Sequence, residues 1–323
     1  MKRRVWWACS IAMGVSLAGG VHAQQYPARP VRLIVPYASG GGVDIMGRII
    51  AAKAAERLGA QMIVENRGGG GTIIGTEAVA KAAPDGYTLL FANPALAAAP
   101  ALNANLPYDT LKSLAPVIMV AASFNVLVAH PSLPVKSVKD LVALARSKPG
   151  QLNYASAGDG SAIYLAMAMF QNTAHIELVH IPYKGAGPAL IDVVGGQVPM
   201  MFIASPPAVG FISAGKLRGL GVSSARRLAI LPDIPTIAES GYPGFEVNNW
   251  YSVMAPADTP SAIIARLNAE INAILAAPEV RERIAALGAE PAGGTPEQFG
   301  RQLKVEMAAW AKVFGKPKTK NSQ

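Results

Sequence analysis

Short apolar runs alternate along the chain with longer segments of helical spacing, and a glycine-rich turn separates many of these pairs. The first unit is an apolar run at 31–35, a turn at 36–42 and a helical pattern at 43–58. Such short runs bounded by turns are typical of buried strands, and apolar residues three or four apart are typical of helices. The repeated unit predicts an α/β fold with parallel-rich sheets and right-handed crossovers.

The same patterns assign the other elements of the chain. Ser137 stands before one predicted helix with Asp140 three residues later, a variant of the capping box. Further strands are expected at 61–65, 88–92, 124–129, 152–155, 178–183, 200–203, 217–223 and 250–255. Further helices are expected at 72–82, 137–147, 161–173, 188–194, 261–276, 278–287 and 296–314.

The rhythm of strands and helices restarts near residue 130, which predicts a second lobe. We expect lobe 1 to comprise residues 24–128 and 250–323, and lobe 2 residues 129–249. The chain would then cross twice between the lobes. Two crossings form the hinge of a clamp-like binding protein, in which a ligand closes two domains over a cleft.

The N-terminus has the three parts of a secretory signal peptide. Residues 2–4 are basic, an apolar stretch covers 5–21, and Val21 and Ala23 are the residues at −3 and −1 of a cut after Ala23. We therefore expect residues 1–23 to be removed on export to the periplasm. An uncleaved membrane anchor is the alternative, but no basic stop-transfer flank follows the apolar stretch.

Composition narrows the classes of function. The single cysteine, Cys9, lies in the signal segment, so the mature chain would have no disulfide or thiol chemistry. The formal charge falls from +9 to +6 because three basic residues leave with the signal. The remaining basic residues are scattered apart from the tail 316–320, an expected frayed end, so nothing indicates nucleic-acid binding. After residue 24 no apolar run is long enough to span a bilayer.

Sequence signatures of enzymes are missing. No Gly-x-x-x-x-Gly-Lys-Ser/Thr loop is present, and no Gly-x-Gly-x-x-Gly follows a strand. His130, His175 and His180 lack the spacing of a zinc helix, and His180 is expected to be a packed side chain. Residues 221–225 half-resemble a nucleophile elbow, but no apolar helix follows. We expect no catalytic residue, metal or cofactor, and keep a secreted hydrolase as an alternative.

Four glycine-rich turns that each precede a helix are the strongest candidates for a binding site: 40–42, 68–71, 157–160 and 185–187. The unpaired N–H groups and the positive dipole end of a helix start favour an anion, and glycine lets the backbone approach it closely. In a parallel sheet these turns lie where ligands bind. Turns from two lobes would suit a small molecule with carboxylates at both ends, unless the glycines serve only the steric needs of the turns.

Asp44 opens the helix after the first of these turns. As a structural residue it would cap the helix or complement its dipole. Beside a carboxylate ligand it would be repulsive unless water or another donor intervened. We expect Asp44 to order the glycine loop and to influence binding indirectly.

A family resemblance is carried by stretches that follow one another along the whole mature chain. They include Pro36-Tyr37-Ala38-Ser39-Gly40-Gly41-Gly42-Val43-Asp44, Val64-Glu65-Asn66-Arg67-Gly68, Ala83-Pro84-Asp85-Gly86-Tyr87-Thr88, Asn153-Tyr154-Ala155-Ser156-Ala157-Gly158, Pro182-Tyr183-Lys184-Gly185 and Leu231-Pro232-Asp233-Ile234-Pro235-Thr236. These stretches resemble the Bug receptors, the extracytoplasmic solute-binding proteins of tripartite tricarboxylate transporters.

The resemblance implies a two-lobed periplasmic-binding-protein fold of the Venus-flytrap kind, type II-like, and a role that is not enzymatic. Such a receptor captures a small organic anion and delivers it to permease subunits in the membrane; a receptor for a membrane sensor kinase is the alternative. We expect a monomer without a nucleic-acid partner. The implied ligand-binding residues, which grip a carboxylate from both lobes and partly through water, are Tyr37, Ser39, Gly40, Gly41, Asp44, Asn93, Ser156, Ala157, Gly158 and Ser161.

Three departures from the family pattern bear on the ligand. Ser39 replaces a frequent proline, Tyr164 a frequent histidine, and Ile203-Ala204 a frequent Asp-Asn pair. Loss of that acid and amide, with a ring at Tyr164, predicts a more apolar distal pocket near Tyr164 and Ile203. An aromatic or longer-chain carboxylate would then suit the site better than citrate, whose additional charges would stay unpaired.

Overall fold

The computed structural model describes residues 26–315, so the predicted signal segment with Cys9 and the basic tail lie outside the described residues. The strands are β1 (Val31–Val35), β2 (Met62–Asn66), β3 (Thr88–Ala92), β4 (Leu114–Ala129), β5 (Asn153–Ser156), β6 (Val179–Pro182), β7 (Met200–Ala204), β8 (Arg218–Val222), β9 (Asn248–Pro256) and β10 (Ala289–Pro291). The helices are α1 (Gly42–Leu58), α2 (Ile73–Ala80), α3 (Ala95–Leu102), α4 (Val138–Ser147), α5 (Ala162–Ala174), α6 (Ala186–Val194), α7 (Ser205–Ser213), α8 (Ser261–Ala276), α9 (Pro278–Ala286) and α10 (Pro296–Phe314), with a 3-10 turn at Gly70–Thr72.

Every predicted strand and helix is present, but the sequence patterns missed α3, α7, β10 and the first ten residues of β4. Helix α3 is apolar throughout and contains Pro100, so it has no polar face to reveal a helical period. Helix α7 starts with Ser205 and two prolines, which resembles a turn. The early part of β4 contains Pro116 and two register shifts, which break the strand pattern.

The sheet is mixed rather than parallel throughout. Its strand order is β2-β1-β3-β9-β4-β7-β5-β6, and β8 and β10 also pair with β4. The outer strands pair in parallel, β1 with β2 and β3, and β5 with β6 and β7, as the strand-turn-helix units predict. Strands β4 and β9 are antiparallel to their neighbours. They run lengthwise through the molecule and link its two parts.

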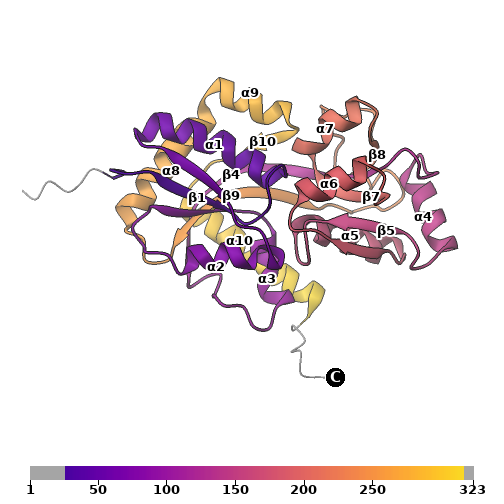
Figure 1. Ribbon diagram of the computed structural model, residues 1–323, viewed down its shortest axis with the longest axis horizontal. Coiled ribbons are helices and arrows are strands. Elements are labelled where there is room, and N and C mark those ends of the chain that lie inside the picture. Colours follow the sequence, from indigo (N-terminus) through magenta and orange to yellow (C-terminus); the bar gives the residue numbers. More distant parts are fainter. Residues whose placement is uncertain (1–25, 316–323) are drawn as a thin grey trace, which may run out of the picture.

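The two-lobed arrangement is visible in Figure 1, with α1–α3 and α8–α10 around one part of the sheet and α4–α7 around the other. We call these parts lobe 1 and lobe 2. Strand β4 pairs with β9 as far as Phe124, opposite Asn248, and with β7 from Asn125, opposite Ala204. The lobes thus meet within β4, and the predicted boundaries at 128/129 and 249/250 stay a prediction.

Each lobe has its own aromatic core. In lobe 2, the ring of Phe170 on α5 meets Phe202 on β7 at 6.0 Å and Phe245 at 6.2 Å, both edge-on. In lobe 1, Trp250 on β9 packs edge-on against Phe299 of α10 at 5.2 Å. Beyond these aromatic contacts, one continuous cluster of buried apolar residues extends from lobe 1 through β4 and β9 into lobe 2. No helix within residues 26–315 is long and apolar enough to cross a membrane.

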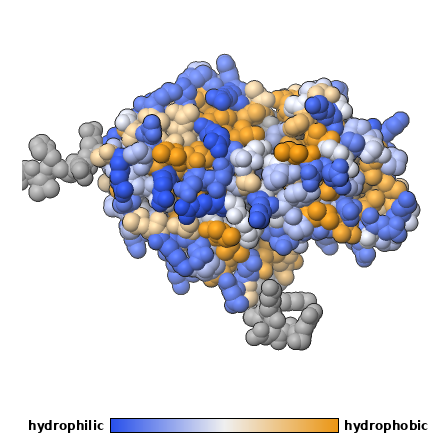
Figure 2. All heavy atoms as spheres, in the orientation of Figure 1, coloured by the Kyte–Doolittle hydropathy of each residue, from blue (hydrophilic) through white to orange (hydrophobic). Residues whose placement is uncertain are grey.

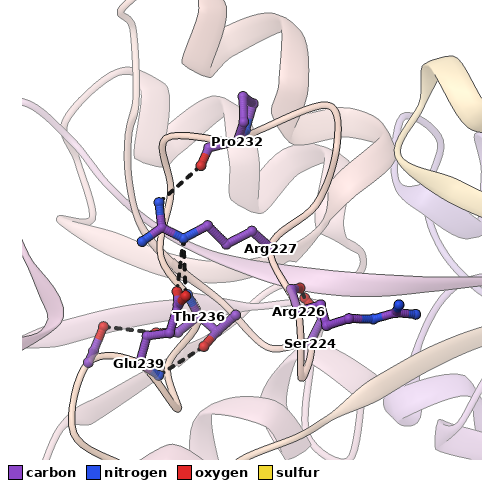
Figure 3. A network of polar contacts seen from close by, with 7 residues as sticks. Ser224, Arg226, Arg227, Pro232, Thr236 and Glu239 are labelled. Carbon is purple, nitrogen blue, oxygen red and sulfur yellow. Dashed lines mark hydrogen bonds and ion pairs between the residues drawn. The ribbon is translucent and has the colours of Figure 1, made fainter.

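The connection from β8 to β9 contains no long element and is held by polar contacts (Figure 3). Arg227 Nε donates to Glu239 Oε2 at 3.0 Å, and the Thr236 N–H donates to the same oxygen at 2.7 Å. The Thr236 N–H and the Arg227 side chain hold the pKa of the Glu239 carboxyl below its usual value. The network lies at the surface. On the face of the molecule that Figure 2 shows, hydrophilic residues cover most of the area and hydrophobic residues form separate patches.

A half-buried carboxylate beside β9 makes the stability of lobe 1 depend on pH. Glu306 of α10 accepts hydrogen bonds from Trp250 Nε1 at 2.6 Å and from Trp310 Nε1 at 3.4 Å. Burial raises the pKa of this carboxyl above its usual value of 4.5, although the indole N–H groups oppose the shift. Protonation therefore favours the folded state, and the stabilisation decreases as pH rises from 4.5 through the folded-state pKa.

We expect Glu306→Gln, which cannot ionise, to remove this pH dependence. The free energy of unfolding of the wild type, relative to E306Q, should decrease in urea titrations as pH rises from 4.5 through the folded-state pKa of Glu306. A difference that stays constant over this range would show that Glu306 keeps the same charge in the folded and unfolded chains.

Candidate functional site

A small cavity lies between the lobes, with an empty volume of about 370 Å³ that includes open solvent at its mouth. Both lobes contribute to its wall, as does β9, one of the two strands that link them. Among the described residues, none that lines it carries a charge. The lining residues are Tyr37, Gly41, Gly42, Val43, Asn93, Ala157, Ser161, Ala162, Ile163, Ala186, Ala204, Asn249 and Tyr251.

The helices of both lobes start at this cavity. Gly41 and Gly42 begin α1, Ser161 and Ala162 begin α5, and Ala186 is the first residue of α6. Ala204 precedes α7, and Asn93 stands two residues before α3. The first N–H groups of a helix have no partner within it and carry partial positive charge. The cavity is therefore suited to an anion without any cationic side chain.

One end of the cavity joins Tyr37 to Asn93 and α5. Tyr37 Oη donates to Asn93 Oδ1 at 3.0 Å, and the Ala95 N–H donates to the same oxygen at 3.3 Å. These two hydrogen bonds orient the side-chain amide of Asn93 through its oxygen. They do not use the Nδ2 hydrogens of that amide. Burial raises the pKa of the Tyr37 hydroxyl, while the side chain of Asn93 and the N–H of Ala162 lower it. Tyr37 thus stays a neutral hydroxyl that links lobe 1 to the start of α5.

The other end lies on the hinge strands. Asn249 Nδ2 donates to Tyr251 Oη at 2.9 Å and to Ser123 Oγ at 3.2 Å. A Cβ added to Gly42 would lie 2.6 Å from Tyr251 Oη and 3.1 Å from the Ala204 side chain. The close approach of α1 to β9 therefore depends on glycine at this position.

Asp44 lies just outside the cavity and fixes the glycine loop. Its carboxylate accepts hydrogen bonds from the Gly40 N–H at 3.0 Å, from Arg48 Nε at 3.0 Å and from Asn66 Nδ2 at 2.9 Å. Burial alone would raise the pKa of Asp44, but these three donors prevail and hold it below its usual value. With its charge paired, Asp44 positions the loop without facing an anion in the cavity.

The loops of the two lobes touch at the mouth of the cavity. The Ala38 N–H donates to Lys184 O at 3.1 Å. Gly187 lies against Ser39 O, and Gly71 against Asp159 O, so closely that neither position has room for a Cβ. These contacts bring the turn at 40–42 against that at 185–187, and the turn at 68–71 against that at 157–160, so the four glycine-rich turns meet in two pairs between the lobes.

The structure brings part of the predicted set together at the cavity wall: Tyr37, Gly41, Asn93, Ala157 and Ser161. Ser39 and Gly40 are exposed, and Ile203 is buried beside the wall. The predicted residues outside the lining are Ser39, Gly40, Asp44, Ser156, Gly158, Tyr164 and Ile203. A role of these residues in binding stays a prediction, and for Asp44 it would be indirect.

Sequence patterns missed the contribution of the hinge strand β9. Asn249 and Tyr251 line the cavity, and Ala204, noted only as a departure, faces them across the N-terminus of α1. A signal was present, because a polar Asn249 stands in a strand that is otherwise buried and apolar. The cavity wall also contains the apolar side chains of Val43, Ile163 and Ala186, and the apolar distal pocket expected near Tyr164 and Ile203 stays a prediction.

Ser156, His180 and Asp159 form a chain of contacts that resembles a hydrolase triad. Ser156 Oγ lies 2.5 Å from His180 Nε2, and His180 Nδ1 lies 3.2 Å from Asp159 Oδ1. However, Ser156 is fully buried, and its hydroxyl also contacts the backbone of Gly158, so it cannot reach a substrate. Burial lowers the pKa of His180, while Asp159 opposes this. The contacts hold the turn that touches Gly71.

No group of three His, Cys, Asp or Glu residues within 26–315 could hold a metal ion. His180 stacks on Tyr154 at 5.0 Å and lies 4.8 Å from Tyr164, so it is packed between aromatic rings, as expected from the sequence.

Comparison with known proteins identifies the class. Residues 46–317 match the family described as "Tripartite tricarboxylate transporter family receptor". The chain is 41% identical to the "UPF0065 protein in tcbD-tcbE intergenic region" of Pseudomonas sp. strain P51, over 97% of this chain and 94% of the relative. It is 40% identical to protein BugT of Bordetella pertussis over 92% of each chain.

Solved structures of similar proteins indicate the same class of protein. The periplasmic binding protein BugD superimposes with a TM-score of 0.87 at 36% identity, covering 90% of this chain and 97% of BugD. Rpa4515 of R. palustris, solved with adipate, superimposes with a TM-score of 0.86 at 36% identity, covering 90% of this chain and 98% of Rpa4515. MatC of Rhodopseudomonas palustris, solved with malate, superimposes with a TM-score of 0.86 at 33% identity, covering 90% of this chain and 100% of MatC.

The fold and the cavity define a two-lobed solute-binding protein of the periplasm, and not an enzyme. The chain belongs to the tripartite tricarboxylate transporter receptor family, which includes the Bug proteins. The resemblance found in the sequence is thus confirmed.

We expect Gly42→Ala to reduce stability through its contact with Tyr251. The added methyl should lower the free energy of unfolding by about 1–3 kcal/mol. In a Tyr251→Phe background the same change should cost less, because the hydroxyl that it meets is gone. Urea unfolding of the four chains of this double-mutant cycle measures the coupling.

Gly210→Ala in α7 is the matched control, since a Cβ there meets nothing within 4 Å. It should stabilise the protein by up to about 1 kcal/mol. Equal costs of Gly42→Ala in both backgrounds would disprove the close approach of α1 to Tyr251.

We expect Asp44→Asn to destabilise the glycine loop in a pH-dependent way. Loss of the charged acceptor should lower the free energy of unfolding at neutral pH by about 1–3 kcal/mol. The pKa of Asp44 is below 3.8 in the folded state, so its stabilisation is complete above 3.8 and is lost as pH falls through the folded-state pKa. The difference between wild type and D44N in urea titrations should therefore shrink in acid; equal stability at neutral pH would contradict this role.

Proposed function

We propose that this receptor binds a small organic carboxylate in the cavity between its lobes and delivers it to permease subunits of a tripartite transporter. The observation that carries the proposal is the convergence of helix N-termini on a cavity without charged side chains. Fixed N–H dipoles can bind a carboxylate there, and a cationic solute would find no counter-charge.

The ligands of similar proteins support the same chemical class. Rpa4515 was solved with adipate and MatC with malate, both aliphatic dicarboxylates. The cavity is small, and Tyr164, the ring expected to favour an aromatic acid, contacts His180 instead of lining the wall. We therefore rank aliphatic acids of a few carbon atoms above aromatic ones.

We further propose that the signal segment is cut after Ala23 and that the mature receptor acts as a monomer. Residues 24–128 with 250–323 would form one lobe and residues 129–249 the other. The pattern of residues 1–23 supports the cut. The intact mass of the protein from periplasmic extract tests it directly.

We expect removal of a single N–H at the cavity to weaken carboxylate binding. Ala162 is the first residue of α5, where proline fits a helix and deletes only the N–H, and Ser161 before it is extended, with ψ 155°. Ala162→Pro should raise the Kd for the best acid of a panel of malate, succinate, adipate and benzoate by about tenfold or more, as measured by calorimetry.

Ser261→Pro is the matched control. Ser261 is the exposed first residue of α8, follows Pro260 with ψ 136°, and lies outside the cavity wall. It should leave both the Kd and the melting temperature unchanged. Failure of every acid in the panel to bind, or equal affinity in A162P and wild type, would refute the proposed site.

A further inference from the structure

Asn125 is a buried amide without a partner at the junction of the lobes. It is fully buried on β4, at the residue where this strand leaves β9 and pairs with β7. Neither Oδ1 nor Nδ2 has a hydrogen-bond partner among residues 26–315, and no other side chain in that range has two such atoms. Buried polar groups in native proteins are almost always paired, so this amide indicates a bound group that completes it.

The strand register shows where the amide points. Ser123 stands two residues before Asn125 and so lies on the same face of β4. Its hydroxyl contacts Asn249 and Tyr251, which both line the cavity. Across the sheet Asn125 is paired with Ala204, which lines the cavity too. Side chains of such a pair stand next to each other on one face, so Asn125 lies beside Ala204, directly behind the residues that line the cavity.

The neighbouring groups are polar and uncharged. Asn249 uses its Nδ2 for Ser123 and Tyr251, which leaves Oδ1 as the acceptor for a ligand. Tyr251 Oη accepts from Asn249 and keeps its own hydrogen to donate. Asn249 and Tyr251 in the wall, with Asn125 behind Ala204, offer acceptors beside donors. A carboxylate, which only accepts, would face amide oxygens, and a methyl group would leave the amides unpaired.

We propose that Asn125, Asn249 and Tyr251 form an uncharged subsite that binds a neutral hydrogen-bonding group, a carboxamide or a hydroxyl, at the far end of the ligand. The inference rests on the proposed function, since the carboxylate of the same ligand occupies the opposite end, near Tyr37, Asn93 and the start of α5. The preferred solute is then an acid with one carboxylate and one neutral polar end.

Three acids of equal length test the subsite: succinamate, succinate and butyrate, which differ only in a carboxamide, a carboxylate or a methyl group at the far end. Their six-carbon counterparts, adipamate, adipate and hexanoate, remove chain length as a variable. Calorimetry on the mature receptor should give a Kd for the carboxamide at least about tenfold below those of its two partners, the value of one hydrogen bond.

Ala204→Asn tests the same subsite from the protein side. An asparagine at 204 stands opposite Asn125 and supplies the missing amide partner, so the ligand-free protein should melt at a higher temperature. The carboxamide should lose its advantage, with affinities within about twofold of the other acids. Ala122→Asn is the control: it adds the same side chain to β4 on the opposite face, paired with Trp250, and should leave the preference intact.

The outcomes separate the two proposals. If the acids bind but the carboxamide has no advantage, or succinate binds more tightly, the uncharged subsite is wrong and the carboxylate receptor stands. If A204N keeps the full preference, Asn125 does not take part. If none of these acids binds at either length, and none of the wider panel does, both proposals fail together.

Discussion

The hydrogen-bonded pairing of β4 is the constraint on which the rest of the structure depends. This one strand pairs with β9 and β10 in lobe 1 and with β7 and β8 in lobe 2. Because its backbone hydrogen bonds continue through the junction, the lobes can rotate about the segment near Phe124 and Asn125 but cannot separate. One side of the cavity therefore lies on the shared strands, through Asn249 and Tyr251 of β9, while the helix N-termini belong to the two lobes.

The helix N-termini at the cavity explain why it needs no charged side chain. A buried lysine or arginine would require desolvation and a partner, and would keep its charge when the cavity is empty. Helix N-termini supply fixed partial charges at no such cost. Asp44, which stands next to the cavity-lining Val43, is paired with Arg48 and Asn66, so its charge fixes the loop and does not oppose an anion.

Most of the fold could be predicted from local patterns because its strands and helices are short and separated by clear turns. Residues 31–58 form the predicted strand, turn and helix almost without change. The failures occur where local signals are weak or misleading: α3 has no polar face, and β4 is interrupted by Pro116 and register shifts. The predicted parallel sheets extend only to the outer strands, since nothing local to β4 or β9 reveals the direction of its neighbours.

Some residues of the candidate site could likewise be found from the sequence, and others only from the tertiary structure. The sequence by itself determined the glycine-rich turns and the helix starts that follow them, because turn and cap geometry depend on a few adjacent residues. The residues Tyr37, Gly41, Asn93, Ala157 and Ser161 were implied by the family resemblance, and the structure places them in the cavity wall. Only the tertiary structure decided that Ala204, Asn249 and Tyr251 meet in the same wall, with Asn125 paired to Ala204 behind it. Their meeting depends on the register of strands far apart in the chain, and register is set by long-range backbone pairing that no local pattern encodes.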